Sequence, residues 1–312
     1  MNKKAVKLLP AFKDYLWGGT RLKEEYNKNS DLDIVAESWE RSTHIDGQSI
    51  IEATGQKLED YIKEQGKEIL GKNALAFEFF PILIKFIDAK GSLSVQVHPS
   101  DEYALRVEGE YGKTEMWYIL DCEEGACLYY GLKSEMSKEE FKKHIEDETL
   151  EDILNKVEVK KGDVFFIEAG TIHAIGAGIV ICEIQQNSNT TYRVYDYGRR
   201  DKYGNLRELH VDKAIEVSNL CPPPPTKKAD VSGDCILASC KYFTVRAVEV
   251  DGEKNITMSS DCFNSVIVTD GEGTLYLNGD TLNLKKGDSI FIPAQDAEYK
   301  IQGKLNTIIS YI

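Results

Sequence analysis

A segment that occurs twice constrains the fold of this chain more than any other feature. Residues 160–175 (KKGDVFFIEAGTIHAI) align without gaps on residues 285–300 (KKGDSIFIPAQDAEYK). Both copies place Lys-Lys-Gly-Asp before an apolar run, which is typical of a turn that leads into a β-strand. Three later residues also recur, because Phe166, Ile167 and Ala169 correspond to Phe291, Ile292 and Ala294. The same turn-and-strand unit is therefore expected once in each half of the chain.

The two copies differ in the residue that could carry chemistry. His173 in the first copy corresponds to Glu298 in the second, and no histidine occurs near the second copy. Candidate chemistry is therefore expected in the N-terminal part of the chain.

The rest of the pattern predicts a mainly β protein with short helical insertions. Helices are expected over residues 56–70 and after the capping-box pattern Ser137-x-x-Glu140. Short β-rich runs punctuated by Gly and Asp fill much of the remainder, up to residue 312. Four prolines at positions 222–225 interrupt any sheet or helix. They predict two domains, 1–225 and 226–312.

The charge of the chain excludes some classes of partner. A formal net charge of −14 disfavours nucleic acid and anionic membrane surfaces, both of which require a basic face. A small anionic substrate could still bind in a local basic pocket. Seven cysteines without a C-x-x-C pair, no secretory signal and no long apolar stretch predict a reduced cytoplasmic protein.

Four side chains form a candidate metal site. The two-residue period of a β-strand places Gln96 and His98 on one face of the run from Leu93, and Glu115 and His173 follow later in the chain. Two imidazoles, a carboxylate and an amide oxygen suit Zn²⁺, with manganese, cobalt and iron as alternatives.

These residues also resemble the two sequence motifs of the cupin superfamily. The pattern Gly162-x5-Glu168-x-Gly170-x-x-His173 is similar to the second motif, although Glu168 stands where that motif has proline. Gln96-x-His98 followed by Glu115 resembles a first motif in which Gln replaces a histidine. That variant is typical of type I mannose-6-phosphate isomerases. Further similarity to this family lies in seven segments: 15–19, 36–39, 84–87, 94–101, 112–117, 170–176 and 183–193.

The resemblance implies a fold and an activity. The fold would be two cupin-type (jelly-roll) β-barrels, a metal-binding catalytic one in 1–225 and a second one without metal ligands in 226–312. The activity would be the interconversion of mannose 6-phosphate and fructose 6-phosphate, with one Zn²⁺ per chain. The partner would be a small hexose phosphate; the sequence does not indicate an oligomeric state.

The resemblance also implies roles for residues around the metal. Arg193 matches the active-site arginine of the family, and Glu183 is a candidate for the proton-transfer group. Glu183 could equally be a structural partner of Arg193, and a metal-bound water or a lysine remain alternatives as the proton carrier. Lys113 would share the face of Glu115 and join the catalytic group. The resemblance implies substrate contacts from Trp17, Glu37, Lys85 and Ser94, although Trp17 and Lys85 could equally have a structural role. Arg199 and Arg200 follow Arg193 closely in the sequence and are expected to complete a local basic pocket for the substrate.

Two other functions fit parts of the pattern. Two histidines and a carboxylate could hold iron in a cupin oxygenase, although Gln96 disfavours that class. A noncatalytic cupin that only binds a sugar phosphate is the second alternative. It leaves the presence of Glu183 and Arg193 beside the metal ligands unexplained.

Overall fold

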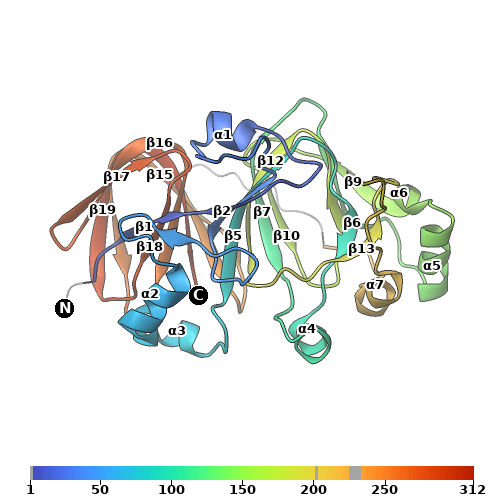
Figure 1. The fold of residues 1–312 in the computed structure, drawn as a ribbon, viewed down its shortest axis with the longest axis horizontal. Helices are drawn as coiled ribbons and strands as arrows, with labels where there is room; N and C mark the ends of the chain where they lie inside the picture. Colours follow the sequence, from blue (N-terminus) through green and yellow to red (C-terminus); the bar gives the residue numbers. More distant parts are fainter. Residues whose placement is uncertain (1–2, 201–202, 225–232) are drawn as a thin grey trace.

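Three antiparallel sheets form the framework of the protein (Figure 1), which is described here by a computed structural model. The structure describes residues 3–200, 203–224 and 233–312. The prediction of a mainly β fold is confirmed. The predicted domain boundary at residue 225 lies outside the described residues.

The first sheet, called here the central sheet, has the strand order β10-β7-β12-β5-β3-β2. Every residue of β5 and β12 is buried, because both faces of this sheet are covered. Alternation along β12 therefore directs Ile181, Glu183 and Gln185 to one face and the residues between them to the other. The strands are β2 (Ala11–Lys13), β3 (Glu37–Arg41), β5 (Ile82–Ala89), β7 (Glu115–Cys122), β10 (Val164–Ile167) and β12 (Ile179–Gln186).

The second sheet, called the lateral sheet, packs on one face of the central sheet. A shared core cluster joins Trp117 and Ile181 of the central sheet to Leu128 and Ile175 of the lateral sheet. The lateral sheet has the strand order β13-β6-β11-β8-β9. The strands are β6 (Val95–Val97), β8 (Cys127–Leu132), β9 (Leu154–Glu158), β11 (His173–Ile175) and β13 (Tyr192–Tyr195).

Three helices cover the other face of the lateral sheet: α5 (Lys138–Glu146), α6 (Leu150–Ile153) and α7 (Val211–Val217). The predicted capping box of α5 is confirmed, since Ser137 and Glu140 bond each other's backbone N–H groups. The apolar stripe of α5, Phe141 and Ile145, is buried as the sequence pattern predicts.

The third sheet contains the C-terminal strands and two strands from the N-terminal part. Its order is β14-β15-β19-β16-β18-β1-β4, with β17 paired to β16. The strands are β1 (Val6–Leu9), β4 (Ile50–Ile51), β14 (Asp234–Ser239), β15 (Thr244–Met258), β16 (Asn264–Leu277), β17 (Asp280–Lys285), β18 (Ser289–Ile292) and β19 (Ala297–Tyr311). Figure 1 shows β1 beside β18, at the side of the molecule away from α5.

The expectation of closed barrels is wrong, because each of the three sheets is open. The C-terminal sheet also differs from a self-contained barrel because β1, from the N-terminal part of the chain, pairs with β18. This pairing buries Leu8 together with Ile51 in the core between the central and C-terminal sheets.

The two copies of the sequence repeat form the same turn. Asp163 accepts a hydrogen bond from the backbone N–H of Lys160, and Asp288 accepts one from Lys285, both at 2.9 Å. The glycine within each turn has a φ near +90°, a conformation that side chains disfavour: 91° at position 162 and 90° at position 287. Each turn leads into a short strand, β10 or β18. Glu298, the counterpart of His173, is exposed on β19.

The remaining helices lie in connections between strands: α1 (Arg21–Glu25), α2 (Leu58–Gln65), η1 (Lys67–Leu70), α3 (Lys72–Leu75) and α4 (Asp101–Val107). The helix expected over residues 56–70 forms as α2 and η1. Gly66, at a φ of 89°, separates the two. No helix in the described ranges has the length and apolar character needed to cross a membrane.

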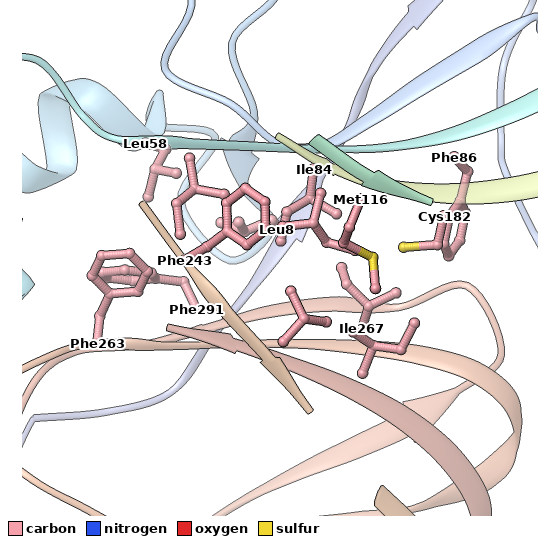
Figure 2. Packing of buried hydrophobic residues seen from close by; sticks show 14 of the residues in the cluster. Leu8, Leu58, Ile84, Phe86, Met116, Cys182, Phe243, Phe263, Ile267 and Phe291 are labelled. Carbon is pink, nitrogen blue, oxygen red and sulfur yellow. The ribbon is translucent and has the colours of Figure 1, made fainter. Parts of the chain in front are cut away.

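Several aromatic side chains lie among the aliphatic residues of the core between the central and C-terminal sheets. Figure 2 shows Phe263 and Phe291 lying near Phe243, with Phe86 and Cys182 at the opposite end of the cluster. The Phe263 ring has no exposed surface and lies 5.6 Å, centroid to centroid, from that of Phe291. This core contains residues from both the N-terminal and the C-terminal parts of the chain, such as Leu8 and Ile308.

Phe263→Ala is expected to lower the free energy of unfolding by about 3–5 kcal/mol, because it leaves a cavity in a core that cannot collapse freely. Chemical denaturation followed by fluorescence measures the change. Ile236→Ala, at a side chain that is 63% exposed, is the control and should change stability by less than about 0.5 kcal/mol. A loss below about 1 kcal/mol for Phe263→Ala would show that this core does not hold the sheets together.

Candidate metal centre and adjoining cavity

The candidate metal-site residues come from the two facing sheets. Gln96 on β6 lies directly opposite His173 on β11 in the lateral sheet, and His98 follows the end of β6. Glu115 is the first residue of β7 in the central sheet. Packing of the lateral sheet on the central sheet therefore brings together side chains that are far apart in sequence.

The four side chains converge on one point. The Nε2 atoms of His98 and His173 lie 3.7 and 3.5 Å from the two carboxylate oxygens of Glu115. Gln96 Nε2 lies 3.5 Å from His98 Nε2 and 3.4 Å from His173 Nε2. The oxygen and nitrogen of an amide exchange places when the group turns by 180°, so Gln96 can offer its oxygen at the same position.

Hydrogen bonds fix both histidines in the form that binds metals. The Nδ1 atom of His98 lies 2.9 Å from the carbonyl oxygen of Thr190, and that of His173 lies 2.8 Å from the carbonyl oxygen of Thr171. Because a carbonyl only accepts, each Nδ1 carries the proton and each Nε2 is left as an acceptor. In His98 this acceptor lies 3.2 Å from Lys113 Nζ. Burial lowers the pKa of His173 to about 4 and that of His98 well below its usual value, so both rings are neutral.

Glu115 has buried oxygens that lack hydrogen-bond donors. Its side chain has no exposed surface, and burial, together with the charge of Glu183, raises its pKa to about 7. Lys113 Nζ lies 2.8 Å from one oxygen as an ion pair, but neither oxygen accepts a hydrogen bond of ordinary geometry from the described residues. Two neutral imidazoles, an amide and an undersatisfied carboxylate therefore fit a divalent cation with nitrogen and oxygen ligands, such as zinc.

A polar cavity adjoins this cluster. It contains seven of the residues that the sequence analysis assigned to catalysis or substrate, together with Gln96. The lining residues are Tyr15, Trp17, Glu37, Lys85, Ile87, Leu93, Ser94, Gln96, Lys113, Ile175, Glu183, Asn189, Thr191, Arg193 and Arg207.

Glu183 lies between two lysines at the base of this cavity. Its Oε1 is 3.6 Å from Lys85 Nζ and 3.7 Å from Lys113 Nζ, and it accepts no hydrogen bond from the described residues. Its Oε2 accepts a hydrogen bond of 2.9 Å from Trp117 Nε1. Burial would raise the pKa of Glu183, but the charges of the two lysines outweigh it, so its pKa is lowered. Glu183 is therefore a carboxylate at neutral pH.

Lys85 also lies near a second carboxylate, Glu37, at 3.5 Å. Burial opposes the charge of Lys85, but Glu37 and Glu183 outweigh it and raise the pKa of the lysine. Trp39 Nε1 donates a hydrogen bond of 2.7 Å to Glu37 and so fixes its carboxylate. This part of the cavity therefore contains two carboxylates and two lysines close together. Each carboxylate accepts a hydrogen bond from a tryptophan.

Two arginines line the cavity wall. Arg193 lies opposite Gln96 in the β13–β6 pair, and its buried Nε has no hydrogen-bond partner among the described residues. Burial lowers the pKa of Arg193, and the nearby charge of Arg207 lowers it further. An anion between these guanidinium groups would relieve their repulsion.

Arg199 and Arg200 lie outside the cavity. Arg199 pairs with Asp196 and lines an adjoining hollow that shares Tyr15, Trp17 and Arg207 with the cavity. Arg200 is exposed and donates a hydrogen bond to the carbonyl oxygen of Gly204. Their assignment to the substrate stays a prediction.

Sequence reasoning missed four residues with polar groups that line the cavity: Tyr15, Asn189, Thr191 and Arg207. The family resemblance could have identified three of them. Tyr15 begins the family-like segment 15–19, and Asn189 and Thr191 lie within the family-like segment 183–193. No motif or strand period marks Arg207. The arrangement as a whole offers charges for a small anion, a candidate cation site beside them and an ionised carboxylate, Glu183, that can accept a proton.

Comparison with known proteins identifies families that match two parts of the chain. Residues 5–128 match the model of the phosphomannose isomerase type I catalytic domain, and residues 234–312 match that of the mannose-6-phosphate isomerase cupin domain.

Full-length relatives are also found. Mannose-6-phosphate isomerase ManA of Bacillus subtilis is 38% identical and covers 97% of both chains. Mannose-6-phosphate isomerase of Streptococcus mutans is 36% identical over 95% of this chain and 94% of its own. A crystal structure of the mannose 6-phosphate isomerase from Bacillus subtilis superimposes with a TM-score of 0.89 at 34% identity, covering 99% of this chain and all of the other.

Proposed function

Because the chain belongs to the type I mannose-6-phosphate isomerase family, whose members have the cupin fold, we propose that it interconverts mannose 6-phosphate and fructose 6-phosphate. One observation carries the proposal. The undersatisfied Glu115 carboxylate and two neutral histidines adjoin a cavity that also contains Glu183 and Arg193.

We infer that Gln96, His98, Glu115 and His173 hold one Zn²⁺ per chain. When bound there, the ion would polarise the sugar oxygens and stabilise the negative charge that develops on them as a proton leaves carbon. The undersatisfied oxygens of Glu115 support this assignment.

We assign the proton transfer to Glu183. An aldose–ketose isomerisation removes a proton from C2 of mannose 6-phosphate and returns one to C1, with a second proton moving between the two oxygens. Glu183 is ionised, faces the cavity and has a free Oε1, so it can accept the first proton and deliver it to the neighbouring carbon. Lys85 and Lys113 would keep this group charged in the resting protein and stabilise charge on the sugar oxygens.

The remaining cavity residues would bind the substrate. Arg193 and Arg207 present two guanidinium groups, which suit a phosphate or an enediolate oxygen. Trp17, Glu37 and Ser94 line the same cavity and would contact the sugar. Arg199, in the adjoining hollow, would add positive charge near the entrance, and Arg200 would act only at longer range.

Chelation tests the proposed function. Removal of metal should reduce conversion of mannose 6-phosphate in a coupled assay to background, and added Zn²⁺ should restore it, with about one zinc per chain by elemental analysis. The reaction should proceed equally without oxygen. Oxygen-dependent turnover with iron would indicate an oxygenase. Binding of the sugar phosphate without turnover would indicate a noncatalytic protein. Full activity in metal-free protein would contradict the zinc assignment.

We retain two predictions from the sequence as part of the proposal. The chain would contain a catalytic unit in 1–225 and a second cupin unit without metal ligands in 226–312, and the separate family matches over 5–128 and 234–312 support this division. A cytoplasmic location would suit a metabolic isomerase.

A further inference from the structure

The carbonyl group that orients His98 lies outside regular structure. Thr190 accepts the hydrogen bond from His98 Nδ1, but it belongs to the connection 187–191 between β12 and β13. No strand pairing fixes a residue there, so other contacts must hold the carbonyl in place. The same connection contributes Asn189 and Thr191 to the cavity wall.

The carboxylate of Glu110 accepts several hydrogen bonds from this connection. Glu110 Oε2 accepts hydrogen bonds from the hydroxyl of Ser188 at 3.4 Å, the backbone N–H of Asn189 at 3.3 Å and the hydroxyl of Thr190 at 3.3 Å. Three consecutive residues therefore converge on a single oxygen. Glu110 itself lies after helix α4 and does not line the cavity.

A buried histidine holds Glu110 from the other side. His44 Nδ1 accepts a hydrogen bond from the backbone N–H of Asp46 at 3.1 Å, so its proton lies on Nε2. That Nε2 lies 3.4 Å from Glu110 Oε1. His44 thus begins a chain of contacts that continues through Glu110 and Thr190 to His98.

We propose that Glu110 is a positioning residue for the cation site: by fixing the connection 187–191, it holds the Thr190 carbonyl that keeps His98 in its metal-binding form. This inference rests on the proposed function, since it assumes that His98 binds a metal. Outer partners of metal-binding histidines set ring orientation and ligand basicity, and their loss commonly costs about 10–100-fold in metal affinity. Because Glu110 acts through one intervening residue, a loss near 10-fold is expected.

The test measures metal binding directly. Zn²⁺ affinity is determined by competition with a chromophoric chelator for the wild-type protein, Glu110→Ala and Glu110→Gln. Both variants should bind Zn²⁺ about 10-fold more weakly and show a changed absorption spectrum with Co²⁺, which reports ligand geometry. Glu102→Ala, at an exposed glutamate on α4, is the matched control and should leave affinity and spectrum unchanged. Thermal unfolding of the metal-free proteins checks that stability is comparable.

The outcomes separate this inference from the proposed function. Unchanged Zn²⁺ affinity and an unchanged Co²⁺ spectrum in Glu110→Gln would overturn the role of Glu110 while leaving the isomerase proposal intact. A wild-type protein that binds no Zn²⁺ would overturn both this inference and the proposed zinc site. If Glu110→Ala does not fold, Glu110→Gln decides alone. It keeps the side-chain volume but has one oxygen for two sets of donors, so either the connection or His44 Nε2 faces an amide N–H group.

Discussion

His173→Ala is expected to remove zinc and turnover together. His173 offers one of two neutral imidazoles to the site, from a position with no exposed surface, where water cannot easily replace it. Loss of a partner that only orients a ligand costs about 10–100-fold in metal affinity, so loss of the ligand itself should exceed about 100-fold. Zinc content after gel filtration and the coupled assay on the same sample measure both effects.

Two further variants make this result specific. His173→Gln offers an amide oxygen in place of the imidazole nitrogen and keeps most of the side-chain volume, so it should retain more zinc than His173→Ala. His144→Ala, on helix α5 and away from the cavity, is the control and should keep full zinc content and activity. Loss of activity in His173→Ala at full zinc content would contradict the assignment of His173 as a ligand.

Local pattern predicted much of the fold and the grouping of the candidate site. A two-residue strand period placed Gln96 and His98 on one face, and the motif-like spacing before His173 indicated a turn followed by a strand. In the structure, Gln96 Nε2 lies 3.5 Å from the Nε2 atom of His98 and 3.4 Å from that of His173. Their function as ligands stays a prediction. The repeat also identified two turns with the same hydrogen bonds, because Gly and Asp in that order determine the turn locally.

Features set by distant contacts could not be predicted in this way. Strand β1 joins the C-terminal sheet because Leu8 completes a core with residues almost 300 positions away, and nothing within β1 encodes that partner. Arg207 reaches the cavity through an irregular segment without a period. Glu110 acquires its role from three donors on another connection. Each of these depends on tertiary packing rather than on local spacing.

Cavity residues can be separated from metal-binding residues by their variants. Arg193 faces the cavity beside Gln96, but its guanidinium is not part of the histidine and carboxylate cluster. A change at Arg193 should therefore leave the metal in place while altering the chemistry. Comparison with His173→Ala therefore tests whether metal binding and catalysis depend on different residues of the site.

Arg193→Ala is expected to keep zinc and lose turnover. The guanidinium stays charged despite its lowered pKa, and it would stabilise negative charge on the phosphate or the enediolate. Removal of one such donor typically reduces kcat by about 10²–10³. Arg193→Lys keeps the charge without the planar fork and should recover part of this loss. Arg106→Ala, on the exposed side of α4, serves as the control. Steady-state kinetics with parallel zinc analysis decide the matter, and a variant without Arg193 that turns over at the wild-type rate would refute its role.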